Sequence, residues 1–111
     1  MSVEGTIEKI EKLTEKGRSD KIVKYVDHKD LQVAKAAIQA LGKLQDETSV
    51  NLLGKLIEAD DPEIRKVAIV EFARGGTQYA KTFLQHLLTK EKDPEVLAIA
   101  TNVVHNYVLK R

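Results

Sequence analysis

Hydrophobic residues recur at helical spacing along most of the chain. After Asp61, the apolar residues Ile64, Val67, Ala68 and Phe72 stand at positions i, i+3, i+4 and i+8, which places them on one face of an α-helix. The alternation of apolar and polar residues that predicts a half-buried strand is absent from the sequence. The pattern therefore predicts an all-α protein.

We expect about seven helices. Two of them begin at Asp30 and Asp61 and end at the short turns Gln45-Asp46 and Gly75-Gly76. The other helices are expected over residues 3–16, 19–26, 47–58, 77–89 and 94–109. In the helix at 77–89, the apolar face is expected to be formed by Ala80, Phe83, Leu84, Leu87 and Leu88. The short turns make the two helices of a pair antiparallel.

The start of a helix is repeated along the chain. Asp30, Asp61 and Asp93 are 31 and 32 residues apart, and an aspartate can accept hydrogen bonds from the unpaired N–H groups of the first turn. Pro62 and Pro94 follow at the first helical position, where a missing N–H costs nothing. A pair of helices cannot bury its apolar face alone, so repeated pairs stack and bury it for one another. The repeat therefore predicts a right-handed α-solenoid of antiparallel helix pairs with three and a half repeats.

We expect the repeats to form a single domain over residues 1–111, because no linker divides the chain. The expected units are an atypical first unit at 1–29, full repeats at 30–60 and 61–92, and a terminal half repeat at 93–111. Corresponding apolar positions recur in the last three of these units. The matched sets are Val33, Ile64 and Val96; Ala37, Ala68 and Ala100; and Leu41, Phe72 and Val104.

The repeated unit also has a recognisable sequence motif. It reads Asp61-Pro62-Glu63-Ile64-Arg65, Asp93-Pro94-Glu95-Val96, and Ala36-Ala37 with Ala40-Leu41-Gly42-Lys43-Leu44. Over residues 30–104 this pattern resembles the HEAT-like repeats of the phycobilisome-lyase type, in the armadillo-like helical superfamily. The resemblance implies a scaffold that hosts many tasks. Members of this family pair an arginine after the helix start with an aspartate between the helices, so the resemblance implies that Arg65 meets Asp46.

The composition excludes several classes of function. There is no cysteine, so disulfides, thiolate metal sites and cysteine nucleophiles are excluded. The 18 basic and 17 acidic residues are mixed along the chain and give a net charge of +1, whereas nucleic-acid-binding proteins usually present a clustered basic face. The N-terminus lacks the apolar block of a signal peptide, and no run approaches the roughly 18 apolar residues of a membrane span. We therefore expect a cytoplasmic protein without a membrane partner, and nucleic acid is disfavoured as a partner.

No constellation of residues predicts catalysis or a cofactor. His28, His86 and His105 are isolated in the sequence, so no helix face offers two imidazoles to a metal. The Arg74-Gly75-Gly76 turn lacks the lysine and the Ser/Thr that follow the glycines of a phosphate-binding loop. We therefore expect a protein that is not an enzyme and that has no catalytic, metal or cofactor site.

One acidic residue interrupts the repeated apolar pattern. Glu71 aligns with Ala40 and Val103, near the middle of the expected buried stripe. A carboxylate there is costly unless it is paired or reaches water. The simpler interpretation is that the stripe is turned slightly, so that Glu71 reaches solvent at its edge. The alternative is a buried carboxylate with a raised pKa or a place in a polar socket.

The second helix of each unit is the expected place for a partner to bind. Its positions outside the core form rows of equivalent residues, such as Lys24, Lys55 and His86, each 31 residues apart. Solenoid proteins use such extended surfaces for binding. The rows fit a mixed polar groove for an acidic or polar segment of another protein, and the simpler interpretation is a solvated surface. The candidate residues are Asp20, Lys24, Asn51, Lys55, Glu58, Thr82, Gln85 and His86.

Two further apolar sets lie outside the expected core. Ile38, Ile69 and Val70 either form exposed surface or pack against a neighbouring unit. The last helix has no second helix after it, so its apolar residues are expected to be partly bare and to offer an interface for a homodimer. These residues are Leu97, Val103, Val104, Tyr107 and Leu109.

The sequence thus predicts a non-enzymatic adaptor that binds another protein through the face formed by its second helices. Two alternatives stay open. The resemblance implies an accessory subunit that assists an enzyme, and a HEAT-like protein that binds nucleic acid is the less favoured alternative.

Overall fold

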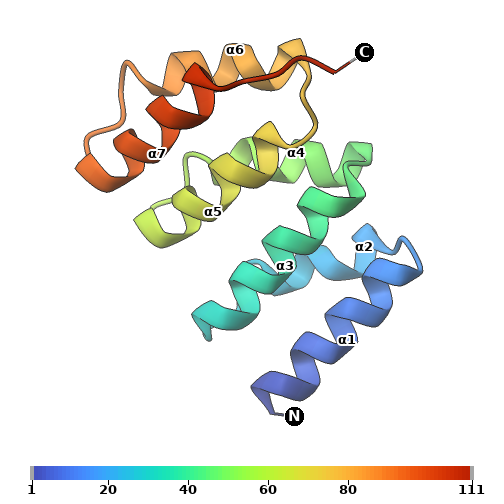
Figure 1. Ribbon diagram of the computed structural model, residues 1–111. Coiled ribbons are helices and arrows are strands. Elements are labelled where there is room, and N and C mark those ends of the chain that lie inside the picture. The colour runs from blue at the N-terminus through green and yellow to red at the C-terminus, as the bar shows by residue number, and fades with distance from the viewer. Residues whose placement is uncertain (1, 111) are drawn as a thin grey trace.

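The structure is a computed structural model that describes residues 2–110 (Figure 1). Within that range it contains seven α-helices, one short 3-10 helix and no strand, so the prediction of an all-α fold is confirmed. The elements are α1 (Val3–Glu15), α2 (Ser19–Ile22), η1 (Val23–Tyr25), α3 (Leu31–Leu44), α4 (Glu47–Leu56), α5 (Pro62–Ala73), α6 (Gln78–Leu87) and α7 (Pro94–His105). The helix predicted over 19–26 is divided between α2 and η1. None of the described helices is long and apolar enough to cross a membrane.

The aspartates predicted to begin helices do so through their side chains. Asp30, Asp61 and Asp93 each accept a hydrogen bond from the backbone N–H two residues on, at 2.9, 2.8 and 2.9 Å. Each bond satisfies a donor that has no partner inside the helix. Pro62 and Pro94 stand in the first turn of α5 and α7, where proline needs no N–H. The repeated aspartate, with the proline that follows it in two of the units, therefore serves to cap and begin a helix.

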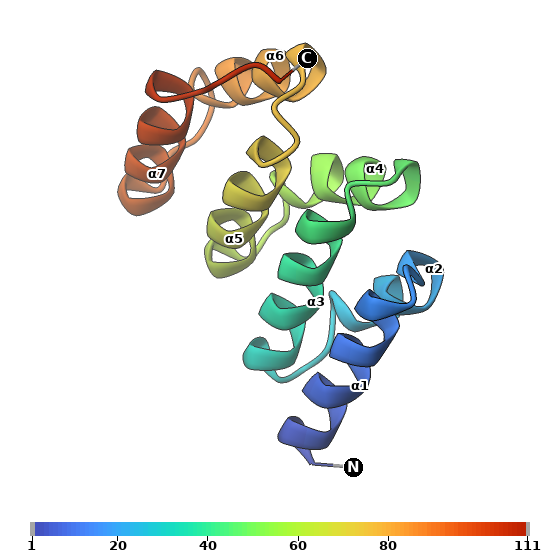
Figure 2. The ribbon, with the colours of Figure 1, turned by 45° about the vertical axis from the view of Figure 1, so that its right-hand side comes forward.

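The first helices of the pairs stack in a row, and the second helices lie along one side of it. Each of α1, α3 and α5 packs against the next first helix, as Figure 1 and Figure 2 show. The second helices sit at the junctions: α4 packs on α3 and α5, and α6 packs on α5 and α7. This arrangement is the α-solenoid of helix pairs that the repeat predicts.

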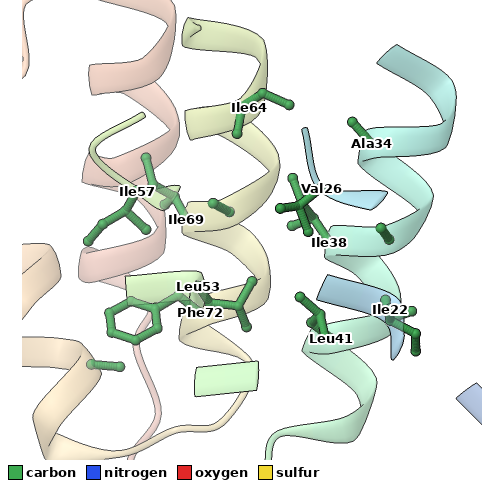
Figure 3. Close-up of a cluster of buried hydrophobic side chains, with 14 of the residues drawn as sticks. Ile22, Val26, Ala34, Ile38, Leu41, Leu53, Ile57, Ile64, Ile69 and Phe72 are labelled. Atoms are coloured by element: carbon green, nitrogen blue, oxygen red, sulfur yellow. The ribbon is translucent and has the colours of Figure 1, made fainter. Parts of the chain in front are cut away.

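One apolar core runs between the first and the second helices. Fully buried members of it, drawn in Figure 3, are Ile22, Ile38, Leu41, Leu53, Ile57, Ile69 and Phe72. Ile38 and Ile69 pack inside this core and do not form exposed surface. Val70, the third residue of that set, is 45% exposed. The core contains no tryptophan and consists mainly of aliphatic side chains.

An arginine of α5 has a side-chain partner other than the one that the resemblance implies. The Arg65 guanidinium donates to both carboxylate oxygens of Glu91 at 2.8 and 2.9 Å, and also to two backbone carbonyls of the preceding loop. Asp46 instead caps α4 and accepts a hydrogen bond from the Ser19 hydroxyl at 2.6 Å. The expected contact between Asp46 and Arg65 is wrong, because each side chain is engaged elsewhere.

A chain of ion pairs crosses the row of first helices. Lys35 of α3 lies 3.4 Å from a carboxylate oxygen of Glu63 on α5, and Glu63 also pairs with Lys66 at 2.9 Å. Lys66 in turn lies 3.2 Å from Glu95 on α7. Ion pairs that stay open to solvent on at least one side contribute little one by one, but these three join α3, α5 and α7 at equivalent positions.

The last helix ends four residues before its predicted boundary, because the tail of the chain turns back. The Tyr107 hydroxyl donates to the carbonyl oxygen of Thr77 at 2.6 Å. The backbone N–H of Lys110 donates to the carbonyl oxygen of Gly76 at 2.8 Å. The tail, residues 106–110, therefore covers the turn between α5 and α6, toward which it runs in Figure 1.

Candidate functional site

The residues expected to bind a partner lie on the second helices and at the surface. All eight are exposed. Asp20 belongs to α2 and Lys24 to η1; Asn51 and Lys55 belong to α4, which Glu58 closely follows; Thr82, Gln85 and His86 belong to α6. We term the exposed surface of α2, η1, α4 and α6 the second-helix face. That these residues bind a partner stays a prediction.

Two acids of the second-helix face are already paired. The Arg18 guanidinium donates to both carboxylate oxygens of Asp20 at 3.1 and 3.0 Å, and this hydrogen bonding lowers the pKa of the Asp20 carboxyl. Glu58 pairs with Lys90, which lies beyond the end of α6. Both pairs are exposed, so each contributes little to stability. A charged partner can therefore displace either pair at small cost.

The basic residues of the face have no acidic partner. Lys24, Lys55 and His86 stand at equivalent positions of three successive units and are exposed. No carboxylate within residues 2–110 forms an ion pair with any of the three. The Lys24 ammonium lies 5.3 Å from the centroid of the Tyr25 ring. These three side chains are thus available to acidic groups from outside the chain.

Two exposed aromatic side chains stand on α6 within the same face. Tyr79 and Phe83, one helical turn apart, are 50% and 43% exposed. Their ring centroids lie 4.9 Å apart, and both rings meet the buried Phe72 ring edge-on at 6.0 and 6.5 Å. Such edge-on contacts are a favoured geometry for aromatic side chains. The core therefore holds this aromatic pair in place while leaving about half of its surface open.

The aromatic pair lies between a glycine of α4 and a hollow with both apolar and charged lining residues. A Cβ atom placed on Gly54 of α4 would lie 3.5 Å from the Phe72 ring and 4.0 Å from the Tyr79 hydroxyl. The rings therefore cover the side of α4 where Gly54 presents no side chain. A hollow of about 270 Å³ lies beside Phe83, and it is lined by Ile57, Glu58, Phe83, His86, Leu87 and Lys90.

The expectation that Phe83 belongs to the buried side of its helix is wrong. The buried side of α6 is formed by Ala80, Leu84 and Leu87, and at 100° per residue Phe83 stands at the edge of that stripe. Tyr79 lies further round the helix and was not among the expected site residues. The signal that identifies the pair in the sequence is the i, i+4 spacing of two aromatic residues outside the aliphatic stripe.

Glu71 is buried, so the expectation that it reaches solvent is wrong. The residue is 4% exposed, and Arg74 donates to both of its carboxylate oxygens at 2.8 and 3.2 Å. Gly42 of α3 leaves the room, since a Cβ atom there would lie 1.9 Å from a Glu71 carboxylate oxygen. The Gln45 side-chain amide donates to the Glu71 backbone carbonyl at 2.9 Å. The alternative of a polar socket is therefore right, and the socket joins α3 to α5.

The described part of the chain offers little for metal chemistry. Within residues 2–110, no group of three or more histidine, aspartate or glutamate side chains is placed to hold a metal ion. The Nδ1 atom of His28 accepts a hydrogen bond from the backbone N–H of Asp30 at 3.0 Å, at the start of α3. This contact gives His28 a local structural role.

Comparison with known proteins identifies the family of the repeat. A family model described as HEAT repeats matches residues 19–104. Comparisons with curated proteins and with solved structures find no match. HEAT repeats generally mediate protein–protein interaction and are typically non-catalytic. The narrower likeness to the phycobilisome-lyase type stays a prediction.

Proposed function

The chain belongs to the HEAT-repeat family, and on that premise we propose that it is a non-enzymatic adaptor that binds another protein through its second-helix face. The observation that carries the proposal is the aromatic pair, Tyr79 and Phe83, which is half-exposed yet anchored on Phe72. Aromatic side chains dominate the binding energy of many interfaces, and rings already held in place lose little conformational entropy on binding.

The charges on the face indicate the chemistry of the partner. Lys24, Lys55 and His86 recur once per unit and lack acidic partners within the described chain. Neighbouring helices are spaced roughly 8–10 Å apart in packed proteins, and three residues of an extended chain span about the same distance. The expected partner is therefore an extended acidic segment that also places an apolar side chain against the aromatic pair.

Capture of partners by the whole chain tests this proposal. The wild-type protein is used to purify partners from the source cells, and the partner found is then titrated against purified variants by calorimetry. Replacing Tyr79 and Phe83 together by alanine is expected to weaken binding by at least about tenfold, because the aromatic anchor is lost. Reversing charge with Lys55→Glu and His86→Glu is expected to weaken binding less, and chiefly at low salt.

A control on the other row of helices separates binding from general damage. Val70 of α5 is 45% exposed, similar to Phe83, and lies outside the second-helix face. Val70→Ala is therefore expected to leave partner affinity unchanged. A partner that binds the double alanine variant as tightly as the wild type would show that the second-helix face is not the binding site.

A further inference from the structure

The first helices carry two hollows in equivalent places. One lies between α1 and α3 and the other between α5 and α7, with volumes of about 430 and 410 Å³. Gln39 and Lys43 line the first hollow, and Val70 and Arg74, each 31 residues later, line the second. Equivalent positions of successive units point the same way in a solenoid. Both hollows therefore open on one surface, which we term the first-helix face.

The space between the two hollows is filled by the polar socket. Glu71 stands at the position of Ala40, which lines the first hollow, and of Val103, which lines the second. Its carboxylate lies against Gly42 and pairs with Arg74. The first-helix face thus has a filled centre at the α3–α5 junction and a hollow on either side of it.

The hollow between α1 and α3, the acidic hollow, carries an excess of carboxylates. Glu11 and Glu15 line it beside a single base, Lys43. Glu4 and Glu8 extend the same stripe of α1, because positions i, i+4, i+7 and i+11 share one helix face. All four carboxylates of the stripe are exposed. The floor of the hollow is apolar, with Ile7, Ile10, Ala36 and Ala40.

The hollow between α5 and α7, the basic hollow, has the opposite character. Within residues 2–110, Arg74 and Lys110 are its charged lining residues, and no acid of that range lines it. The Arg74 side chain is 50% exposed even though it pairs with Glu71. Val70 and Val108, also in the lining, are 45% and 74% exposed. This hollow therefore combines positive charge with uncovered apolar surface.

We propose that the first-helix face is a self-association surface on which two copies of the chain pack about a two-fold axis. In an isologous interface, residue i of one copy meets residue j of the other, and j meets i. With the axis near the α3–α5 junction, the acidic hollow of each copy covers the basic hollow of its partner. Both complementary contacts form at once, and the exposed valines are covered.

The size of the face fits such an interface. The face consists of four first helices of 12 to 14 residues. At a rise of 1.5 Å per residue, each helix is about 20 Å long. If each helix is roughly 10 Å wide, the four together present a face of about 800 Å². A standard interface buries about 800 Å² on each partner. This dimer leaves the second-helix face free. The proposal of a dimer is therefore independent of the proposed adaptor function.

Sedimentation equilibrium with charge-reversal variants tests the proposal. The wild-type chain is expected to show a monomer–dimer equilibrium that weakens as salt rises. The acidic-hollow variant is Glu11→Lys with Glu15→Lys. The basic-hollow variant is Lys110→Glu with Asn102→Glu, which adds a negative charge at a neutral residue of the same lining. Each variant is expected to lose at least about tenfold in dimer affinity. An equimolar mixture of the two variants is expected to restore the dimer, because each reversed hollow then meets an opposite charge.

The controls leave each outcome decisive. Lys9→Glu with Lys16→Glu reverses two charges on the opposite side of α1 and is expected to leave the dimer unchanged. Recovery of the dimer in the mixture excludes misfolding as the reason for its loss in the separate variants. A wild-type chain that stays monomeric at high concentration and low salt would overturn the proposal. A dimer that resists the acidic-hollow variant would overturn it too, and would point to the surface of α7 lined by Pro94, Leu97 and Thr101.

Discussion

Two helical glycines of this protein have opposite structural meanings. At Gly42 a Cβ atom would lie 1.9 Å from a carboxylate oxygen of Glu71 and 2.7 Å from its Cβ atom, so glycine is required there. At Gly54 a Cβ atom would meet only the Phe72 ring at 3.5 Å and the Tyr79 hydroxyl at 4.0 Å, which are ordinary contact distances. Glycine within a helix lowers stability. At Gly42 the close approach of Glu71 compensates for this cost, whereas at Gly54 nothing comparable does.

Alanine substitutions at these two glycines are therefore expected to change stability in opposite directions. Gly42→Ala forces Glu71 out of its socket and is expected to cost about 1–3 kcal/mol. Gly54→Ala stiffens α4 without a clash and is expected to add about 0.5–1 kcal/mol. Urea unfolding of each variant measures both effects. A further Glu71→Ala change should recover part of the loss caused by Gly42→Ala, and equal stability of Gly42→Ala and wild type would contradict this account of the socket.

Glu91 is a second acid whose environment decides its chemistry. Its side chain is 4% exposed, and burial alone raises the pKa of a carboxyl. Hydrogen bonds from Arg65 and from the backbone N–H groups of Asp93 and Lys92 outweigh burial and hold the pKa of Glu91 below its ordinary value of 4.5. A carboxyl whose pKa is lowered by folding stabilises the folded chain only while it is ionised.

The contribution of Glu91 is therefore expected to be present above about pH 4.5 and to be lost as pH falls below that value. Glu91→Gln should lower the free energy of unfolding by about 1–3 kcal/mol at neutral pH, since hydrogen bonds between charged groups are lost. The difference from wild type should shrink in acid, as followed by urea unfolding across the pH range. Glu58→Gln, which breaks only an exposed pair, serves as the control, and a difference that stays constant with pH would contradict the assignment.

At the scale of elements, helix starts could be predicted from the sequence because their chemistry is local. Asp61 and Pro62 act within one turn of the helix that they begin, so a short stretch of sequence contains all the relevant contacts. The end of α7 depends instead on a bond between Tyr107 and Thr77, which are 30 residues apart. The burial of Glu71 likewise depends on a distant glycine. Periodicity reports which positions face the core, and it does not report contacts between distant elements.

The tail is expected to stabilise the start of α6. Burial raises the pKa of the Tyr107 hydroxyl, so the group keeps its proton at neutral pH and donates to Thr77. Tyr107→Phe removes this one donor and is expected to cost about 0.5–1.5 kcal/mol, with faster amide exchange at the turn between α5 and α6. Tyr79→Phe is the matched control, because the Tyr79 side chain is 50% exposed. Unchanged exchange at that turn in Tyr107→Phe would show that the tail does not hold it.

At the scale of the whole molecule, the site follows from how the units stack. The eight predicted residues are all exposed, because solvent-facing positions follow from the helical period and from the repeat length. The aromatic pair escaped prediction because an aromatic residue beside an aliphatic stripe fits the core equally well in sequence terms. The stacking also distributes the chemistry: the second helices carry the aromatic pair and bases without an acidic partner within residues 2–110, and the first helices carry the chain of ion pairs from α3 to α7 and the acidic and basic hollows. One chain thereby offers two surfaces of different character.

Stacking of this kind also determines which helices lose stability when one buried side chain is truncated. Each unit of a solenoid contacts only its neighbours, so local stability depends on adjacent units. Ile10 lies in α1, at the N-terminal end of the row, whereas Leu53 lies in α4, between α3 and α5. Truncating either buried side chain to alanine is expected to cost about 2–5 kcal/mol locally. Native-state hydrogen exchange should then show Ile10→Ala lowering protection in α1 and α3 but not in α7, and Leu53→Ala lowering it on both sides. Equal loss of protection in α7 for both variants would mean that the chain opens as one unit, without the neighbour-by-neighbour coupling that a stack of repeats implies.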